Sequence, residues 1–154
     1  MENNVDTQPD LPMKWHNFLI YFALWAGGIL NGISGFRAIS GTQYGADAGR
    51  VYSYYPGLKT IDVIFGAFVI FIAIFTIVTR FKLAGFRKDG PTCLFLVYIL
   101  NAVGSVFYIL AVVSTTSLSL DTFGAQLVGQ IVGSIILVCA NKVYYNNRAY
   151  MFVY

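Results

Sequence analysis

The side chains that could do chemistry inside the apolar part of this chain are few, and most of them are uncharged amides. Asn31, Asn101, Gln126 and Gln130 lie within long runs that contain no Asp, Glu, Lys or Arg. An amide donates and accepts hydrogen bonds but does not exchange a proton near neutral pH. Such groups either bond one membrane helix to another or line a polar cavity for a neutral solute. Both alternatives remain open from the sequence.

Groups for acid–base or nucleophilic catalysis do not converge in this sequence. His16 is its single histidine, and Cys93 and Cys139 stand far apart in separate apolar runs. Catalysis by serine, cysteine or paired carboxylates needs a base beside the nucleophile at one depth, and zinc needs three or four donors. We therefore expect no catalytic residue, no metal site and no cofactor. An intramembrane enzyme is the third alternative.

Three charged residues mark the ends of apolar runs and are candidates for pairing. Arg37 follows the first run, Asp62 precedes the second and Asp121 precedes the fourth. We predict rim ion pairs among them, each contributing about 0 to 1 kcal/mol in partly wet surroundings. A metal or substrate site is the alternative interpretation.

Four runs free of charged residues must position these groups: 15–36, 63–79, 90–120 and 122–141. A bilayer core needs about 20 helical residues to cross. Hydrophobic residues make up 57% of the 154 residues and charged residues 11%, against about 25% charged in soluble domains. The sequence predicts an all-α integral membrane four-helix bundle within 13–141, with spans at about 16–37, 60–80, 92–114 and 122–141.

The segments outside the spans are short and polar or aromatic. Residues 1–12 carry too little apolar surface to fold and lack the basic start of a signal peptide, so we expect a disordered cytoplasmic tail. Residues 142–154 mix tyrosines with Lys142 and Arg148, which predicts an interfacial segment on the inner leaflet. In the loop 37–59 we expect a short helix near 46–55 that ends at Pro56.

Positive charges predict the orientation. One side collects Lys14, Arg80, Lys82, Arg87, Lys88, Lys142 and Arg148, whereas the other has Arg37, Arg50 and Lys59. The richer side is cytoplasmic by the positive-inside rule, so both termini are expected inside. Four of these charges (Arg80, Lys82, Arg87 and Lys88) crowd into one loop, where we expect contact with inner-leaflet lipid rather than nucleic acid.

Small and polar residues form stripes on three spans, the pattern that associates helices in lipid. They are Gly28, Asn31, Gly32 and Gly35 in the first span, Asn101 and Ser105 in the third, and Gln126, Gly129, Gln130, Gly133 and Ser134 in the fourth. We predict that the first and fourth spans touch at Asn31 and Gln130, and the third and fourth at Asn101 and Ser134. The second span is expected to face lipid broadly.

Several segments resemble a set of small four-span integral membrane proteins of Firmicutes. They are LPMKWHNFLIYFALWAGGILNGISGF, GTQYG, YYPGLKTIDVIFG and TRFKLAGFRKDGP, which together cover roughly the first 91 residues. The resemblance implies a multi-pass protein of the bacterial plasma membrane. No activity is established for that set, so it implies no mechanism.

Our leading hypothesis from the sequence is a non-enzymatic membrane protein that acts by helix–helix association, with itself as a homo-oligomer or with a membrane partner. The alternative is a small oligomeric channel or facilitator for a neutral or lipophilic solute, lined by Asn31, Asn101, Gln126 and Gln130. The two hypotheses differ in what the amides touch. Mutually bonded amides in a dry interior favour association, whereas amides along a continuous cavity favour a solute.

Overall fold

The computed structural model describes residues 11–154 and consists of helices and connecting turns. In chain order they are α1 Lys14–Phe18, the π-helix η1 Leu19–Ala23, α2 Leu24–Ser40, the 3-10 turn η2 Thr42–Asp47, α3 Ala48–Tyr54, α4 Pro56–Ala84, α5 Gly90–Thr116, the 3-10 turn η3 Leu120–Phe123, α6 Gly124–Asn146 and the 3-10 turn η4 Ala149–Met151. Four helical runs are long and apolar enough to cross a membrane. The predicted all-α architecture is confirmed.

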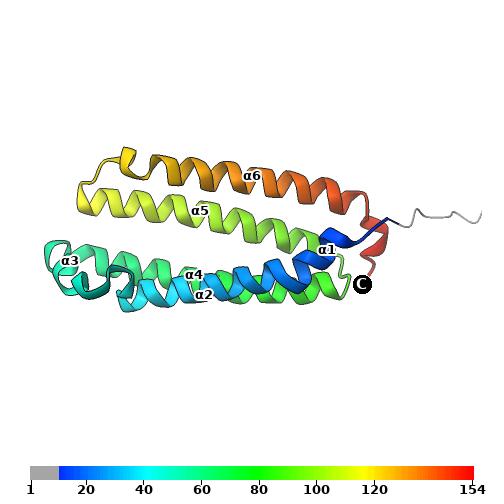
Figure 1. Ribbon diagram of the computed structural model, residues 1–154, viewed down its shortest axis with the longest axis horizontal. Coiled ribbons are helices and arrows are strands. Elements are labelled where there is room, and N and C mark those ends of the chain that lie inside the picture. Colours follow the sequence, from blue (N-terminus) through cyan, green and yellow to red (C-terminus); the bar gives the residue numbers. More distant parts are fainter. Residues whose placement is uncertain (1–10) are drawn as a thin grey trace, which may run out of the picture.

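Each predicted span falls inside one of these helical runs, and the helices run lengthwise along the molecule (Figure 1). The described chain starts and finishes at the same end, which we call the termini end. The opposite end, which carries α3 and the α5–α6 connection, is called the loop end. Most of the predicted tail, residues 1–10, lies outside the described residues.

The loop helix α3 ends where the sequence predicted, because Pro56 begins a new helix. Tyr55 between α3 and α4 has a non-helical backbone (φ −128°, ψ 75°), the kind of conformation that a following proline imposes. Gly41 ends α2 in the left-handed region (φ 75°), which lets the chain turn back towards the bundle.

Glycines bring α2 and α4 into direct backbone contact. A Cβ added to Gly35 would lie 2.7 Å from the carbonyl oxygen of Gly66, and one added to Gly66 would lie 2.6 Å from that of Gly35. A Cβ added to Gly28 would instead meet a side chain, at 2.6 Å from Ile77 Cδ1, and would lie 3.5 Å from the carbonyl oxygen of Ala73. Close approach of this kind maximises the van der Waals contact that associates membrane helices.

The second span, α4, is therefore the centre of the bundle, and the prediction that it faces lipid broadly is wrong. It packs against α2 on one side and α5 on the other. Its buried threonines, Thr76 and Thr79, donate their hydroxyl hydrogens to carbonyls one turn earlier, at 2.7 and 2.8 Å. Because this satisfies their polarity within the helix, the two threonines can be buried without polar partners on neighbouring helices.

The fourth span has fewer neighbours. Figure 1 shows α5 beside α6 and α2 beside α4, and the contacts between α4 and α5 join the two pairs. Within the described residues, α6 packs against α5 and the short η3, but α2 and α6 do not form a packed interface. The bundle is therefore open along the side between α2 and α6.

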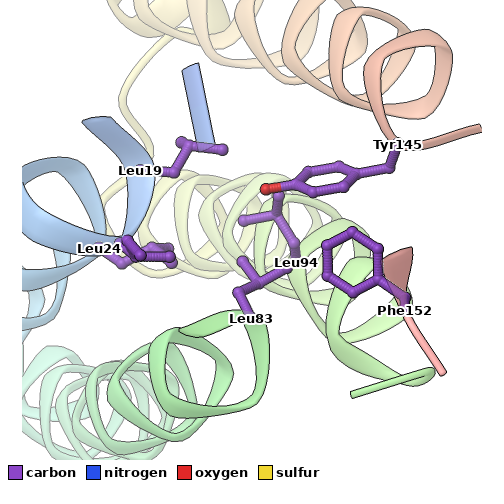
Figure 2. Close-up of a cluster of buried hydrophobic side chains, with 7 residues drawn as sticks. Leu19, Leu24, Leu83, Leu94, Tyr145 and Phe152 are labelled. Atoms are coloured by element: carbon purple, nitrogen blue, oxygen red, sulfur yellow. The ribbon is translucent and has the colours of Figure 1, made fainter. Parts of the chain in front are cut away.

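An apolar core closes the termini end. Figure 2 shows Leu19, Leu83, Leu94, Tyr145 and Phe152 converging from the first span, α4, α5 and the C-terminal segment. The backbone N–H of Lys88 donates to the carbonyl of Tyr154 at 2.7 Å. The predicted interfacial segment 142–154 is thus folded onto the bundle: α6 continues to Asn146, and Phe152 is buried against the helices.

Arg80 is held by the protein rather than left for lipid headgroups. Its Nε donates to the carbonyl of Ile20 in the π-helix at 3.0 Å, and its guanidinium lies 5.4 Å from the ring of Trp25. Lys82 pairs with Asp89 and lowers the pKa of that carboxyl below its ordinary value. Of the four residues predicted to contact the inner leaflet, Arg87 and Lys88 keep exposed side chains without such partners in the described chain; contact of these two with lipid stays a prediction.

Candidate functional site

A cavity of about 430 Å³ lies between the first span, α5 and α6. Its apolar walls come from both halves of the first span and from the facing helices, including Phe18, Leu19, Leu24, Val97 and Leu137. Its polar groups are Trp15, Asn31, Thr76, Tyr98, Asn101, Gln130 and Ser134, with Gly27, Gly129 and Gly133 beside them. No Asp, Glu, Lys or Arg belongs to this wall.

A smaller cavity of about 180 Å³ continues from the first towards the loop end. The two share Asn31, Asn101 and Gln130, and the second adds Ser34 and Ser105. Residues predicted to bond helices together therefore line two adjoining cavities. We call the two cavities together the central cavity.

The amides of the central cavity do not bond to one another. Asn101 Nδ2 donates to the carbonyl of Val97 in its own helix at 2.8 Å. Asn31 and Gln130 make no hydrogen bond within residues 11–154, and both side chains are half-buried. The predicted contact of Asn31 with Gln130 is wrong, because the cavity separates α2 from α6.

The glycine stripes have two different roles. In the first span Gly28 and Gly35 press against α4, and a Cβ on Gly32 would reach Ala73 Cβ at 4.0 Å. In α6, a Cβ added to Gly129 or Gly133 would meet nothing within 4 Å. The first-span stripe is therefore a packing face, but it packs on the second span. The α6 stripe faces open space, and its first member, Gln126, is exposed.

The wall of the cavity contains an irregular helix. Leu19 and Ala23, at the ends of the π-helix Leu19–Ala23, both line the central cavity. Wider π turns occur often at functional sites, because they displace side chains and free backbone groups. Here Arg80, which does not line the cavity, donates a hydrogen bond to one of those backbone groups, the carbonyl of Ile20.

Aromatic and polar residues close the cavity at the termini end. Trp15 Nε1 donates to Asn141 Oδ1 at 3.0 Å, which ties the start of the first span to α6. Behind it, His16 is buried, with its ring stacked on Phe86 at 5.2 Å and Nδ1 3.1 Å from the hydroxyl oxygen of Tyr145. His16, the single histidine of the sequence, is therefore part of this closure.

At the loop end, Asp62 is completely buried between two tyrosines. The hydroxyl of Tyr108 on α5 donates to Asp62 Oδ1 at 2.8 Å, and that of Tyr52 on α3 donates to Oδ2 at 3.0 Å. Gln43 Nε2 lies 3.4 Å from the hydroxyl oxygen of Tyr108. We call these four residues the Asp62 cluster. It joins the loop, α4 and α5.

The predicted rim ion pairs are wrong. Within residues 11–154, Arg37 pairs with neither Asp62 nor Asp121; the ion pairs there are Arg50 with Asp47 and Lys82 with Asp89. Asp121 instead accepts from its near neighbour Ser119, at 3.3 Å. Asp62 cannot reach a rim cation because it faces α5 inside the bundle, at the seventh residue of α4.

Sequence reasoning did not single out Trp15, Asn141 or Tyr52 as partners. In the sequence, Trp15 and Asn141 are the ends of apolar runs, and Tyr52 belongs to the loop 37–59. The signal that could have found them is chemical: Trp15 and Asn141 stand at the edges of apolar runs, and all three residues carry a polar group that needs a hydrogen-bond partner when buried.

Comparison with known proteins adds no family to this geometry. No protein-family model matches the chain, and no match was found among curated proteins or solved structures. Function must therefore be argued from the site itself.

Proposed function

We propose that this chain is a multi-pass membrane protein that binds a neutral amphiphilic molecule in its central cavity and acts as a small facilitator for it. The observation that carries the proposal is the pair of amides, Asn31 and Gln130, that face the cavity without a hydrogen-bond partner in the described chain. Half-buried polar groups in an apolar wall call for a partner, and a ligand with a hydroxyl, carbonyl or amide supplies one.

The size and the chemistry of the cavity support this ligand class. A volume of about 430 Å³ falls within the range of small-molecule pockets, about 300 to 1,000 Å³. Apolar side chains from three directions suit a hydrocarbon body, and neutral amides near the middle suit one uncharged polar group. A charged group would enter without a counter-charge in the wall, which is costly at membrane depth.

The opening between α2 and α6 gives the ligand a route from the lipid. These helices do not form a packed interface, and Gly129 and Gly133 keep the α6 side of the opening free of side chains. A lipophilic molecule can therefore enter sideways without leaving the bilayer. We further propose that the membrane is the bacterial plasma membrane and that both termini are cytoplasmic, as the positive charges indicate.

Association with itself or with a membrane partner is the second candidate, and one observation favours it. The most apolar stretch of α6 contains no residue that is buried in the described structure. Along this stretch α6 packs on α5 and leaves surface on which a further helix could pack. In this alternative, a helix of another chain would cover the opening that we assign to the ligand.

Native mass spectrometry of the protein released gently from membranes tests both candidates. We expect wild type to carry a small lipophilic adduct, and Gly133→Trp to lose it because the indole fills the cavity. Ile136→Trp is the matched control, since Ile136 lies on the same helix with 60% of its surface exposed. An adduct retained by Gly133→Trp would contradict the proposal, and a protein-sized increment in place of the adduct would support association.

A further inference from the structure

We propose that a second pocket, at the loop end, binds an organic cation, with the buried carboxylate of Asp62 as its counter-charge. The pocket has a volume of about 360 Å³ and lies among the loop, α3, α4, α5 and η3. It shares no lining residue with either part of the central cavity. The inference therefore does not depend on the function proposed above.

Four aromatic rings contribute to the wall of this pocket. Tyr44, Tyr55, Tyr108 and Phe123 line it, together with aliphatic residues and Gln43. Ring faces attract ammonium groups through their quadrupole, and several rings around one space form the aromatic cage that recognises quaternary ammonium ions. A neutral apolar ligand would also fit such a wall. The negative charge of Asp62 is the feature that favours a cationic ligand over a neutral one.

The Asp62 carboxylate has hydrogen bonds but no counter-ion. Its side chain is 0% exposed, and it accepts from Tyr52 and Tyr108. No cationic side chain of residues 11–154 pairs with it. Arg37, Arg50 and Lys59 of the loop are exposed, and Arg50 pairs with Asp47 at 3.7 Å. Two hydroxyl donors offset only part of the cost of burying a charge, which a nearby cation would offset further.

Tyr108 connects the carboxylate to the pocket. Its hydroxyl donates to Asp62 at 2.8 Å while its side chain forms part of the pocket wall. The ring of Tyr108 also stacks on the ring of Phe65, with centroids 4.0 Å apart. A tyrosine whose hydroxyl donates to a carboxylate has a more electron-rich oxygen and ring. The charge of Asp62 therefore makes the electrostatic potential at the pocket surface more negative.

Binding of choline to the purified full chain in a maltoside detergent, measured by titration calorimetry, tests the inference. The matched probe is dimethylbutanol, in which a carbon atom replaces the quaternary nitrogen and the charge is lost. We expect choline to bind at least about tenfold more tightly than dimethylbutanol, as expected for a desolvated cation–π site with a counter-charge. Equal affinity for the two probes, or no binding of choline, would overturn the inference.

Variants assign the charge preference to this pocket. Asp62→Asn should weaken choline binding by about tenfold, whereas Asp121→Asn, at an exposed carboxylate, should leave it unchanged. If Asp62→Asn does not fold, Tyr55→Leu serves instead, because Tyr55 lines the pocket and makes no side-chain hydrogen bond in the described chain. Choline affinity that stays the same in the folded variants would place the cation elsewhere and contradict the assignment.

Discussion

Replacing Gly35 by alanine should lower the free energy of unfolding by about 1 to 3 kcal/mol, the usual cost of overpacking a close contact. The new methyl group would lie 2.7 Å from the Gly66 carbonyl oxygen and 2.7 Å from Ile70 Cγ1, so α2 and α4 must move apart. Because a backbone oxygen is one of the two clashing atoms, side-chain rotation alone cannot relieve the contact. Unfolding in mixed micelles by a denaturing detergent measures the change.

Gly27→Ala is the control for this prediction. Gly27 lies in the same helix, but an added Cβ there meets nothing within 4 Å. It should leave stability unchanged or raise it slightly, since alanine favours helix more than glycine does. Equal losses at Gly27 and Gly35 would show that α2 and α4 do not meet through this glycine face.

Replacing Phe152 by alanine should cost about 3 kcal/mol of stability, as for other buried phenylalanines. The ring is 6% exposed and lies 5.5 Å from the ring of Phe86 and 5.3 Å from that of Tyr145. Its loss opens a cavity in the core that closes the termini end (Figure 2). The same detergent-driven unfolding measures the loss of stability.

Val153→Ala is the matched control at the adjacent position, where the side chain is 53% exposed. It should change stability by less than about 0.5 kcal/mol. If Phe152→Ala changed stability as little as Val153→Ala, the C-terminal segment would not be part of the folded bundle. It would then match the predicted interfacial segment instead.

The number and positions of the helices could be predicted from the sequence, because a lipid bilayer restricts the length and composition of a membrane span. Runs without charges located the four spans, and Pro56 located the end of α3. Both signals are local: one reflects the cost of charge in hydrocarbon, and the other reflects the fixed geometry of proline.

The pairing of the helices could not be predicted, because a stripe of small residues does not identify the helix that it contacts. Gly28 and Gly35 on α2 contact α4, whereas Gly129 and Gly133 on α6 face open space. The stripes to which they belong both repeat at intervals of three and four residues. In α4 the small residues that meet α2 are Gly66 and Ala73, which lie among bulky apolar side chains. Small-residue spacing permits close approach but does not select the partner.

The environment of Asp62 depends on a contact between elements. The residue was interpreted as a rim charge because it begins an apolar run, yet α3 folds back so that Tyr52 reaches it, and α5 supplies Tyr108. The sequence around Asp62 would be the same whether the residue lay at the rim or inside the bundle. Only the path of the loop decides whether its carboxylate faces water or two hydroxyl groups.

The central claim is that a cavity, not a packed interface, separates α2 from α6. Disulfide formation in membranes tests it most directly, because a disulfide needs Cβ atoms about 3.5 to 4.5 Å apart. The test pair is Gly27→Cys with Gly133→Cys, and the positive control is Gly32→Cys with Ala73→Cys, whose Cβ atoms would lie 4.0 Å apart. Both pairs are placed in a chain with Cys93 and Cys139 replaced by alanine.

We predict that mild oxidation cross-links the control pair readily and leaves the test pair reduced, while a long bifunctional thiol reagent joins the test pair. Direct disulfide formation between positions 27 and 133, at a rate similar to that of the control pair, would show that α2 and α6 pack against each other and would contradict the account.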